Sequence, residues 1–153
     1  MKRKEHITSF YLETLLMIIV FVGIILVLTQ VFGLARSRSV QAKEKTSAVC
    51  LCQNAAEAFA AAESSQELLD LLNQNHNASL ESADDNRGFI KAFYDTDRNP
   101  DANGILKIEV SWEKGEKTAG KDKVLRYAKI VASKDKKVIY NLETSVYDEE
   151  GWK

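Results

Sequence analysis

The apolar residues of this chain are concentrated in one long stretch near the N-terminus. Residues 10–34 are apolar except at four positions, Glu13, Thr14, Thr29 and Gln30. As a helix, this stretch rises about 37 Å at ~1.5 Å per residue, which exceeds the ~30 Å hydrocarbon core of a bilayer. A soluble core does not need a helix that is apolar on every side over such a length. The pattern therefore predicts a membrane-spanning helix over residues 9–35.

Basic residues lie on both sides of the predicted span, so they do not by themselves decide its orientation. Residues 1–8 form a basic leader that is too short to fold alone. We therefore expect the leader in the cytoplasm and the chain after residue 35 on the outer side of the cell membrane, held by a single pass. Gly33 and Ala35 would also satisfy the small-residue rule for signal cleavage, so a secreted product cut after Ala35 is an alternative.

The helical pattern continues beyond the span. No proline or glycine occurs between residue 34 and Gly88, and Ala48, Cys52, Ala55 and Phe59 follow one another at steps of four, three and four residues. This spacing places the four side chains on one stripe of a helix. It predicts an amphipathic continuation of the helix over residues 36–62.

A shorter helix and a polar segment follow. Ser64 and Glu67 form a capping box, which predicts a helix start and a short helix over residues 65–73. Residues 74–87 are mostly polar and are interpreted as a loop, including the glycosylation-like triplet that begins at Asn77. Residues 63–87 are thus expected to connect the long helix with the next part of the chain.

Alternating apolar and polar residues predict the remaining elements. Four segments alternate with a period of two: residues 88–95, 105–113, 124–133 and 137–147. Short, turn-rich links favour an antiparallel meander, and its apolar face needs a covering layer. The predicted fold class is α+β, in which the outer half of the long helix packs on a four-stranded antiparallel sheet built from residues 88–153.

Composition restricts the classes of function. The chain has 21 basic and 22 acidic residues, and this balance disfavours nucleic acid as a partner. Two cysteines and two histidines leave few ligands for a zinc site, and no phosphate-binding glycine loop or Gly-x-Ser-x-Gly motif occurs. Cys50 and Cys52 point in different directions on a helix and cannot bridge each other. These observations predict a protein that is not an enzyme.

One loop carries residues that suit a metal ion. Oxygen-bearing side chains alternate before Gly104, at positions Asp95, Asp97, Asn99, Asp101 and Asn103. Oxygen ligands at every second position suit calcium, although the twelfth position counted from Asn99 is Val110 and not glutamate. The alternative is a hairpin loop in which the Asx side chains cap their own turns. We expect no cofactor, and calcium at this loop is the alternative.

Glu13 is the main functional candidate, because an ionisable residue within a membrane span usually has a function. It ends the segment Ser9-Phe10-Tyr11-Leu12-Glu13, which follows the basic leader. This start, together with the apolar helix and residues 53–59, resembles the type IV pilins and pseudopilins, in particular divergent pilin-like proteins of Gram-positive bacteria. The resemblance covers the N-terminal 60 residues; Thr8 stands where the family usually has glycine, and Gln30 where many members have proline.

The resemblance implies a function in assembly. A prepilin peptidase would cut between Thr8 and Ser9, and the Glu13 carboxylate would then neutralise the new amine of its own or a neighbouring subunit, with Phe10 beside it in the helix packing. The implied function is a minor structural subunit of a type IV filament, secretion or DNA-uptake apparatus, whose partners are other pilin-like subunits. The alternative is a membrane-anchored binding or sensor protein that does not polymerise, in which Glu13 lies at the headgroup level.

Overall fold

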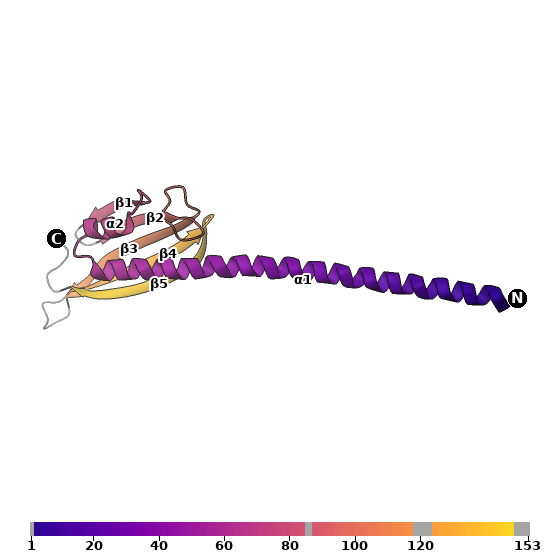
Figure 1. Cartoon of the computed structure of the whole chain (residues 1–153). Helices are drawn as coiled ribbons and strands as arrows, with labels where there is room; N and C mark the ends of the chain where they lie inside the picture. The colour runs from indigo at the N-terminus through magenta and orange to yellow at the C-terminus, as the bar shows by residue number, and fades with distance from the viewer. Residues whose placement is uncertain (1, 85–86, 118–123, 149–153) are drawn as a thin grey trace. The chain divides into compact units, whose positions relative to one another are not determined.

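The computed structural model describes residues 2–84, 87–117 and 124–148 (Figure 1). The chain divides into two compact units, Met1–Ala42 and Lys43–Lys153. Helix α1, Lys2–Ala61, contributes to both units, and all the strands belong to the second one, which we call the sheet unit.

In the first unit, α1 carries exposed side chains on all sides from residue 10 to residue 42. Among the described residues it is the one helix that is long and apolar enough to cross a membrane. The hydroxyls of Thr14 and Thr29 donate hydrogen bonds to the carbonyl oxygens of Phe10 and Ile25, each at 2.9 Å. These bonds satisfy the two hydroxyls inside the helix, as a lipid environment requires. The structure therefore agrees with the sequence on a helix that is able to cross a membrane.

The sheet unit contains a five-stranded antiparallel meander in the order β1-β2-β3-β4-β5. Its strands are β1 Ala78–Asp84, β2 Arg87–Tyr94, β3 Leu106–Lys117, β4 Val124–Lys134 and β5 Lys137–Asp148. Within this unit, the C-terminal part of α1 lies along one face of the sheet (Figure 1). The α+β fold and the meander are confirmed, whereas the predicted number of four strands is wrong.

The missed strand is β1, which occupies part of the segment predicted as a polar loop. Only Ala78 and Leu80 of this edge strand pack against the core, and a register shift between Leu80 and Ser82 interrupts the alternation. With only two inward-facing apolar residues and this register shift, β1 lacks the regular apolar–polar alternation by which a strand is predicted from sequence. Asn77, just before the strand, is buried, accepting a hydrogen bond from the Gln74 N–H and donating one to the Phe93 carbonyl oxygen. Asn77 therefore has a structural role, because its buried side chain links the backbone after α2 to the backbone of β2.

The core forms between the sheet and one stripe of α1. The predicted stripe residues Ala48, Cys52, Ala55 and Phe59 are all buried, and Leu51 joins them. Helix α2, Ser65–Leu72, covers the neighbouring part of the same face with Leu68 and Leu72. Its start is capped as predicted, because the Glu67 N–H donates to the Ser64 hydroxyl at 3.1 Å.

The inner face of the sheet contributes alternate residues to this core. Ile90, Val110 and Ile130 form one fully buried cross-strand row in its centre. Nearer one end, Gly88 on β2 lies opposite Trp112 on β3, and the indole ring occupies the space that a side chain at Gly88 would need. Trp112 is buried, as the sequence predicts; Trp152 lies outside the described residues.

This pairing makes Gly88 sensitive to substitution. A Cβ at position 88 would overlap the Trp112 ring, so Gly88→Ala must displace a buried indole. We expect the free energy of unfolding to fall by about 1–3 kcal/mol, the usual cost of overpacking. Denaturation of the full chain in detergent, followed by tryptophan fluorescence, measures it. Gly33→Ala is the matched control, because no atom lies within 4 Å of a Cβ at that position; equal stability of both variants would contradict the tight Gly88–Trp112 contact.

Candidate functional site

The first candidate site lies at the N-terminal end of the apolar half of α1. Phe10 and Glu13 are three residues apart on the helix and therefore share one of its faces. Both side chains are exposed, and the Phe10 ring contacts Tyr11 edge-on at 6.3 Å between centroids. The backbone of Thr8 and Ser9 continues the helix, but their side chains lie outside the described residues, so the predicted processing site stays a prediction.

Glu13 needs a partner if this part of the helix is surrounded by lipid or by other helices. No cation among the described side chains forms an ion pair with it within its own chain. A carboxylate in a low-dielectric environment is costly unless a positive charge or hydrogen-bond donors compensate it. The geometry thus presents an aromatic ring and a carboxylate together on an exposed apolar helix, in an arrangement suited to contact with a second helix.

In the acidic loop between β2 and β3, the Asp95 and Asp101 side chains accept hydrogen bonds from the backbone of the loop itself. Asp95 accepts hydrogen bonds from the backbone N–H groups of Asp97 and Asn99, both at 2.8 Å, and from the Asn99 side-chain amide at 2.9 Å. These bonds, led by that of the Asn99 side chain, lower the pKa of Asp95. Asp101 likewise accepts from the Asn103 N–H. The described residues contain no cluster of three His, Cys, Asp or Glu side chains arranged to share a metal ion.

Asp97 of the same loop is part of a small polar clamp within the sheet unit. Its carboxylate pairs with Lys43 Nζ at 2.7 Å, and the Ser47 hydroxyl donates to the Thr96 carbonyl oxygen. The next residue of α1, Glu44, pairs with Lys134, and this hydrogen bond raises the pKa of the lysine. The clamp joins the first turns of α1 in this unit to the β2–β3 loop and to the last residue of β4.

The two cysteines have different environments and both are free. Cys52 is buried beside β4, whereas Cys50 is half-buried. Burial raises the pKa of the Cys52 thiol to about 11, and a backbone hydrogen bond with Ala132 offsets part of the effect. Cys52 therefore belongs to the core, as its place on the helical stripe predicts.

The difference between the cysteines predicts selective labelling. At pH 8, maleimide is expected to modify Cys50 of the folded chain and to leave Cys52 unmodified, since thiolate is the reactive form and the Cys52 thiol is both protonated and buried. Intact-mass analysis should show one adduct in the native chain and two in denaturant. Cys50→Ser is the control, and it should remove the native adduct; rapid modification of Cys52 in that variant would contradict the buried position.

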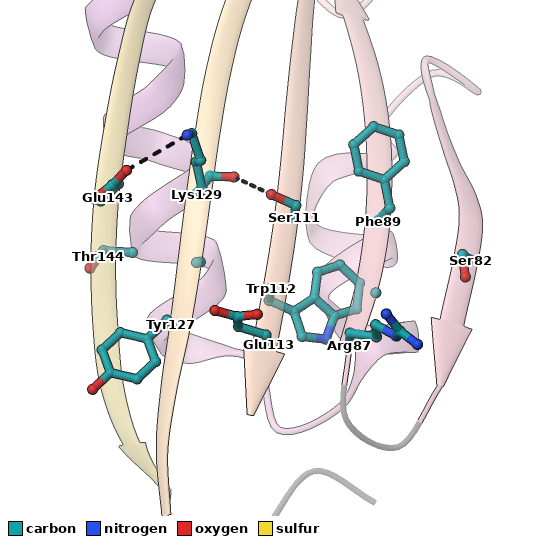
Figure 2. Close-up of a pocket in the computed structure, with 12 residues that line it drawn as sticks. Ser82, Arg87, Phe89, Ser111, Trp112, Glu113, Tyr127, Lys129, Glu143 and Thr144 are labelled. Atoms are coloured by element: carbon teal, nitrogen blue, oxygen red, sulfur yellow. Dashed lines mark hydrogen bonds and ion pairs between the residues drawn. The ribbon is translucent and has the colours of Figure 1, made fainter. Parts of the chain in front are cut away.

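A second candidate site, which sequence reasoning missed, is a shallow hollow on the outer face of the sheet, the face opposite α1 (Figure 2). Its volume is about 550 Å³. Its side-chain walls come from outward-facing residues of all five strands: Ser82, Arg87, Phe89, Ser111, Glu113, Tyr127, Lys129 and Glu143. Because neighbouring residues of a strand point to opposite faces, Gly88, Trp112, Ala128 and Thr144 contribute mainly backbone to the floor.

The hollow is lined by two basic and two acidic side chains, and only some of them form ion pairs with each other. Lys129 and Glu143 approach each other to 3.8 Å at an exposed position, which makes a weak pair. Arg87 and Glu113 are direct cross-strand partners, yet they form no ion pair with each other, and their side chains point apart (Figure 2). The hollow therefore offers both donors and acceptors to a ligand.

Comparisons with known proteins identified no match for this chain. No family model, no curated protein and no solved structure matches this chain. The fold is thus α+β, and helix α1, which is long and apolar enough to cross a membrane, continues into the core of the sheet unit.

Proposed function

We propose that this protein is a minor, pilin-like structural subunit of a type IV filament or of a related secretion or DNA-uptake apparatus. The observation that carries the proposal is the continuous helix α1, whose first half is apolar and exposed and whose second half forms the core of an antiparallel sheet unit. Such a helix is suited first to anchor the subunit in the membrane and then to pack against the helices of other subunits.

The face that carries Phe10 and Glu13 supplies the specificity of this packing. An apolar helix alone associates with many others, whereas a carboxylate must meet a positive charge at one axial position. The resemblance of residues 9–13 to the start of a mature pilin identifies that charge as an amine created by cleavage after Thr8. The leader is then cytoplasmic and the sheet unit extracytoplasmic, and the membrane, a prepilin peptidase and other pilin-like subunits are the partners.

The experiment that tests this proposal is determination of the N-terminus and intact mass of the protein from the membranes of its own host. A chain that begins at Ser9, particularly with a methylated amine, is the expected result. An intact chain that begins at Met1 would favour the non-polymerising membrane-anchored binding protein. A chain that begins at Arg36 would identify a secreted protein and would overturn the proposal.

A further inference from the structure

The hollow on the outer face of the sheet has properties of a binding site that the proposed assembly function does not use. Two aromatic rings, Phe89 on β2 and Tyr127 on β4, stand at diagonally opposite corners of it (Figure 2). Strands β2 and β4 are two strand spacings apart, or about 10 Å. A ligand that touches both rings must therefore be elongated.

Neighbouring residues shape the surroundings of both rings. The Lys91 ammonium lies 5.2 Å from the centroid of the Phe89 ring, and Lys91 itself is fixed by an ion pair with Glu81. Gly115 provides the space beside Tyr127, since a Cβ there would lie 2.8 Å from the Cε2 atom of the ring. The Lys91 contact positions the Phe89 ring before a ligand binds, and a side chain that is already positioned loses little entropy on binding.

The charges of the hollow restrict the chemistry of the ligand. Two cations, Arg87 and Lys129, and two anions, Glu113 and Glu143, line it. A polyanion such as nucleic acid requires a basic excess, and a lipid surface requires a continuous apolar patch, so neither fits this lining. An extended peptide typically adds to the edge of a sheet and not to its face. An uncharged ligand with many hydroxyl groups fits, because hydroxyls both donate to carboxylates and accept from guanidinium and ammonium groups.

We propose that this hollow binds an uncharged, elongated glycan. The apolar faces of two sugar rings stack on Phe89 and Tyr127, and the hydroxyls between them donate to the Glu113 carboxylate and to the Ser111 hydroxyl oxygen. The Ser111 hydroxyl itself donates to the Lys129 carbonyl oxygen at 3.1 Å (Figure 2). Trp112 and Gly88 beneath the hollow keep its floor flat, because position 88 carries no side chain and the indole fills the inner side. This site belongs to the sheet unit alone, so the proposal is independent of whether the chain assembles.

The test is calorimetric titration of the full-length chain in lipid nanodiscs with chitotetraose and cellotetraose. We expect saturable binding of at least one probe with a Kd of about 0.1–1 mM, the range of a small contact of this kind. Tyr127→Ala and Phe89→Ala should each weaken binding roughly tenfold, which corresponds to about 1.4 kcal/mol. Tyr127→Phe should retain it, because the ring remains.

Tyr147→Ala is the matched control. Tyr147 is an exposed tyrosine of β5 that does not line the hollow, so binding should be unchanged. Circular dichroism of each variant confirms that it is folded. Absence of binding by both neutral probes would overturn the proposal, as would equal binding by the folded Tyr127→Ala variant. Tighter binding of the acidic probe tetragalacturonate would also overturn it, since the surface would then select for negative charge.

Discussion

Glu13→Ala is expected to leave the protein in the membrane but to remove it from filaments. Insertion depends on the apolar stretch of α1, which the substitution makes more apolar, so the amount in the membrane should not fall. Assembly depends, in the proposed function, on a charge pair between Glu13 and an amine in a dry helix bundle. Removal of one partner of such a pair costs about 3–5 kcal/mol, which predicts a decrease of roughly a hundredfold or more in incorporation.

The measurement is the amount of the protein in a sheared filament fraction relative to the membrane fraction of the same cells. Glu13→Gln should fail in the same way, because it keeps the shape of the side chain and removes its charge. Gln30→Ala is the matched control, since Gln30 is a polar residue of the same span with no place in the proposed pair. Normal incorporation of Glu13→Ala would exclude the paired role and would favour a carboxylate at the headgroup level.

Phe59→Ala is the second substitution for which we expect a large effect, in this case on stability. Phe59 is fully buried between α1 and the sheet, and the guanidinium carbon of Arg126 lies 5.7 Å from the centroid of its ring. Truncation would open a large cavity and remove the cation–π contact with the buried arginine. The free energy of unfolding should fall by roughly 3–5 kcal/mol.

Denaturant unfolding of the full chain in detergent measures this loss. Phe59→Leu keeps most of the apolar volume, so it should cost less than the alanine variant, and the difference between the two separates packing from ring-specific contact. Tyr147→Ala should change stability by no more than about 0.5 kcal/mol, because Tyr147 is an exposed surface residue. An unchanged midpoint for Phe59→Ala would contradict the position of the α1 stripe in the core.

Prediction from the sequence succeeded where the pattern of apolar and polar residues within one helix or strand is sufficient to identify it. The apolar stretch of α1 predicted a membrane anchor because its length and its lack of a polar side are local properties. The stripe from Ala48 to Phe59 identified the buried face of the helix for the same reason, and Ser64 with Glu67 marked the start of α2. Alternation located β2, β3 and β4 because each buries the residues of its inner face, and it located β5 although the inner residues of this edge strand are only partly buried. β1 lacks this signal.

The candidate sites also divide into those that the sequence could predict and those that only the structure shows. Glu13 and Phe10 could be paired from the sequence, since residues three apart on a helix share a face. The acidic loop could not be interpreted from its alternation alone, because Asp95 and Asp101 cap the backbone only in the conformation that the loop adopts between β2 and β3. The clamp between Glu44 and Lys134 was likewise not predictable, as it joins residues far apart in the chain.

The sequence by itself determined the apolar anchor helix, the buried face of α1 and the α+β class. The reason is that the periodicity of a helix or a strand depends only on residues close together in the chain. Only the tertiary structure decided which residues meet across strands. The hollow between Phe89 and Tyr127 depends on the pairing of β2, β3 and β4 in one register, and a shift by one residue would turn these rings to the other face. Register is set by the packing of the whole sheet against α1, and no single segment contains that information.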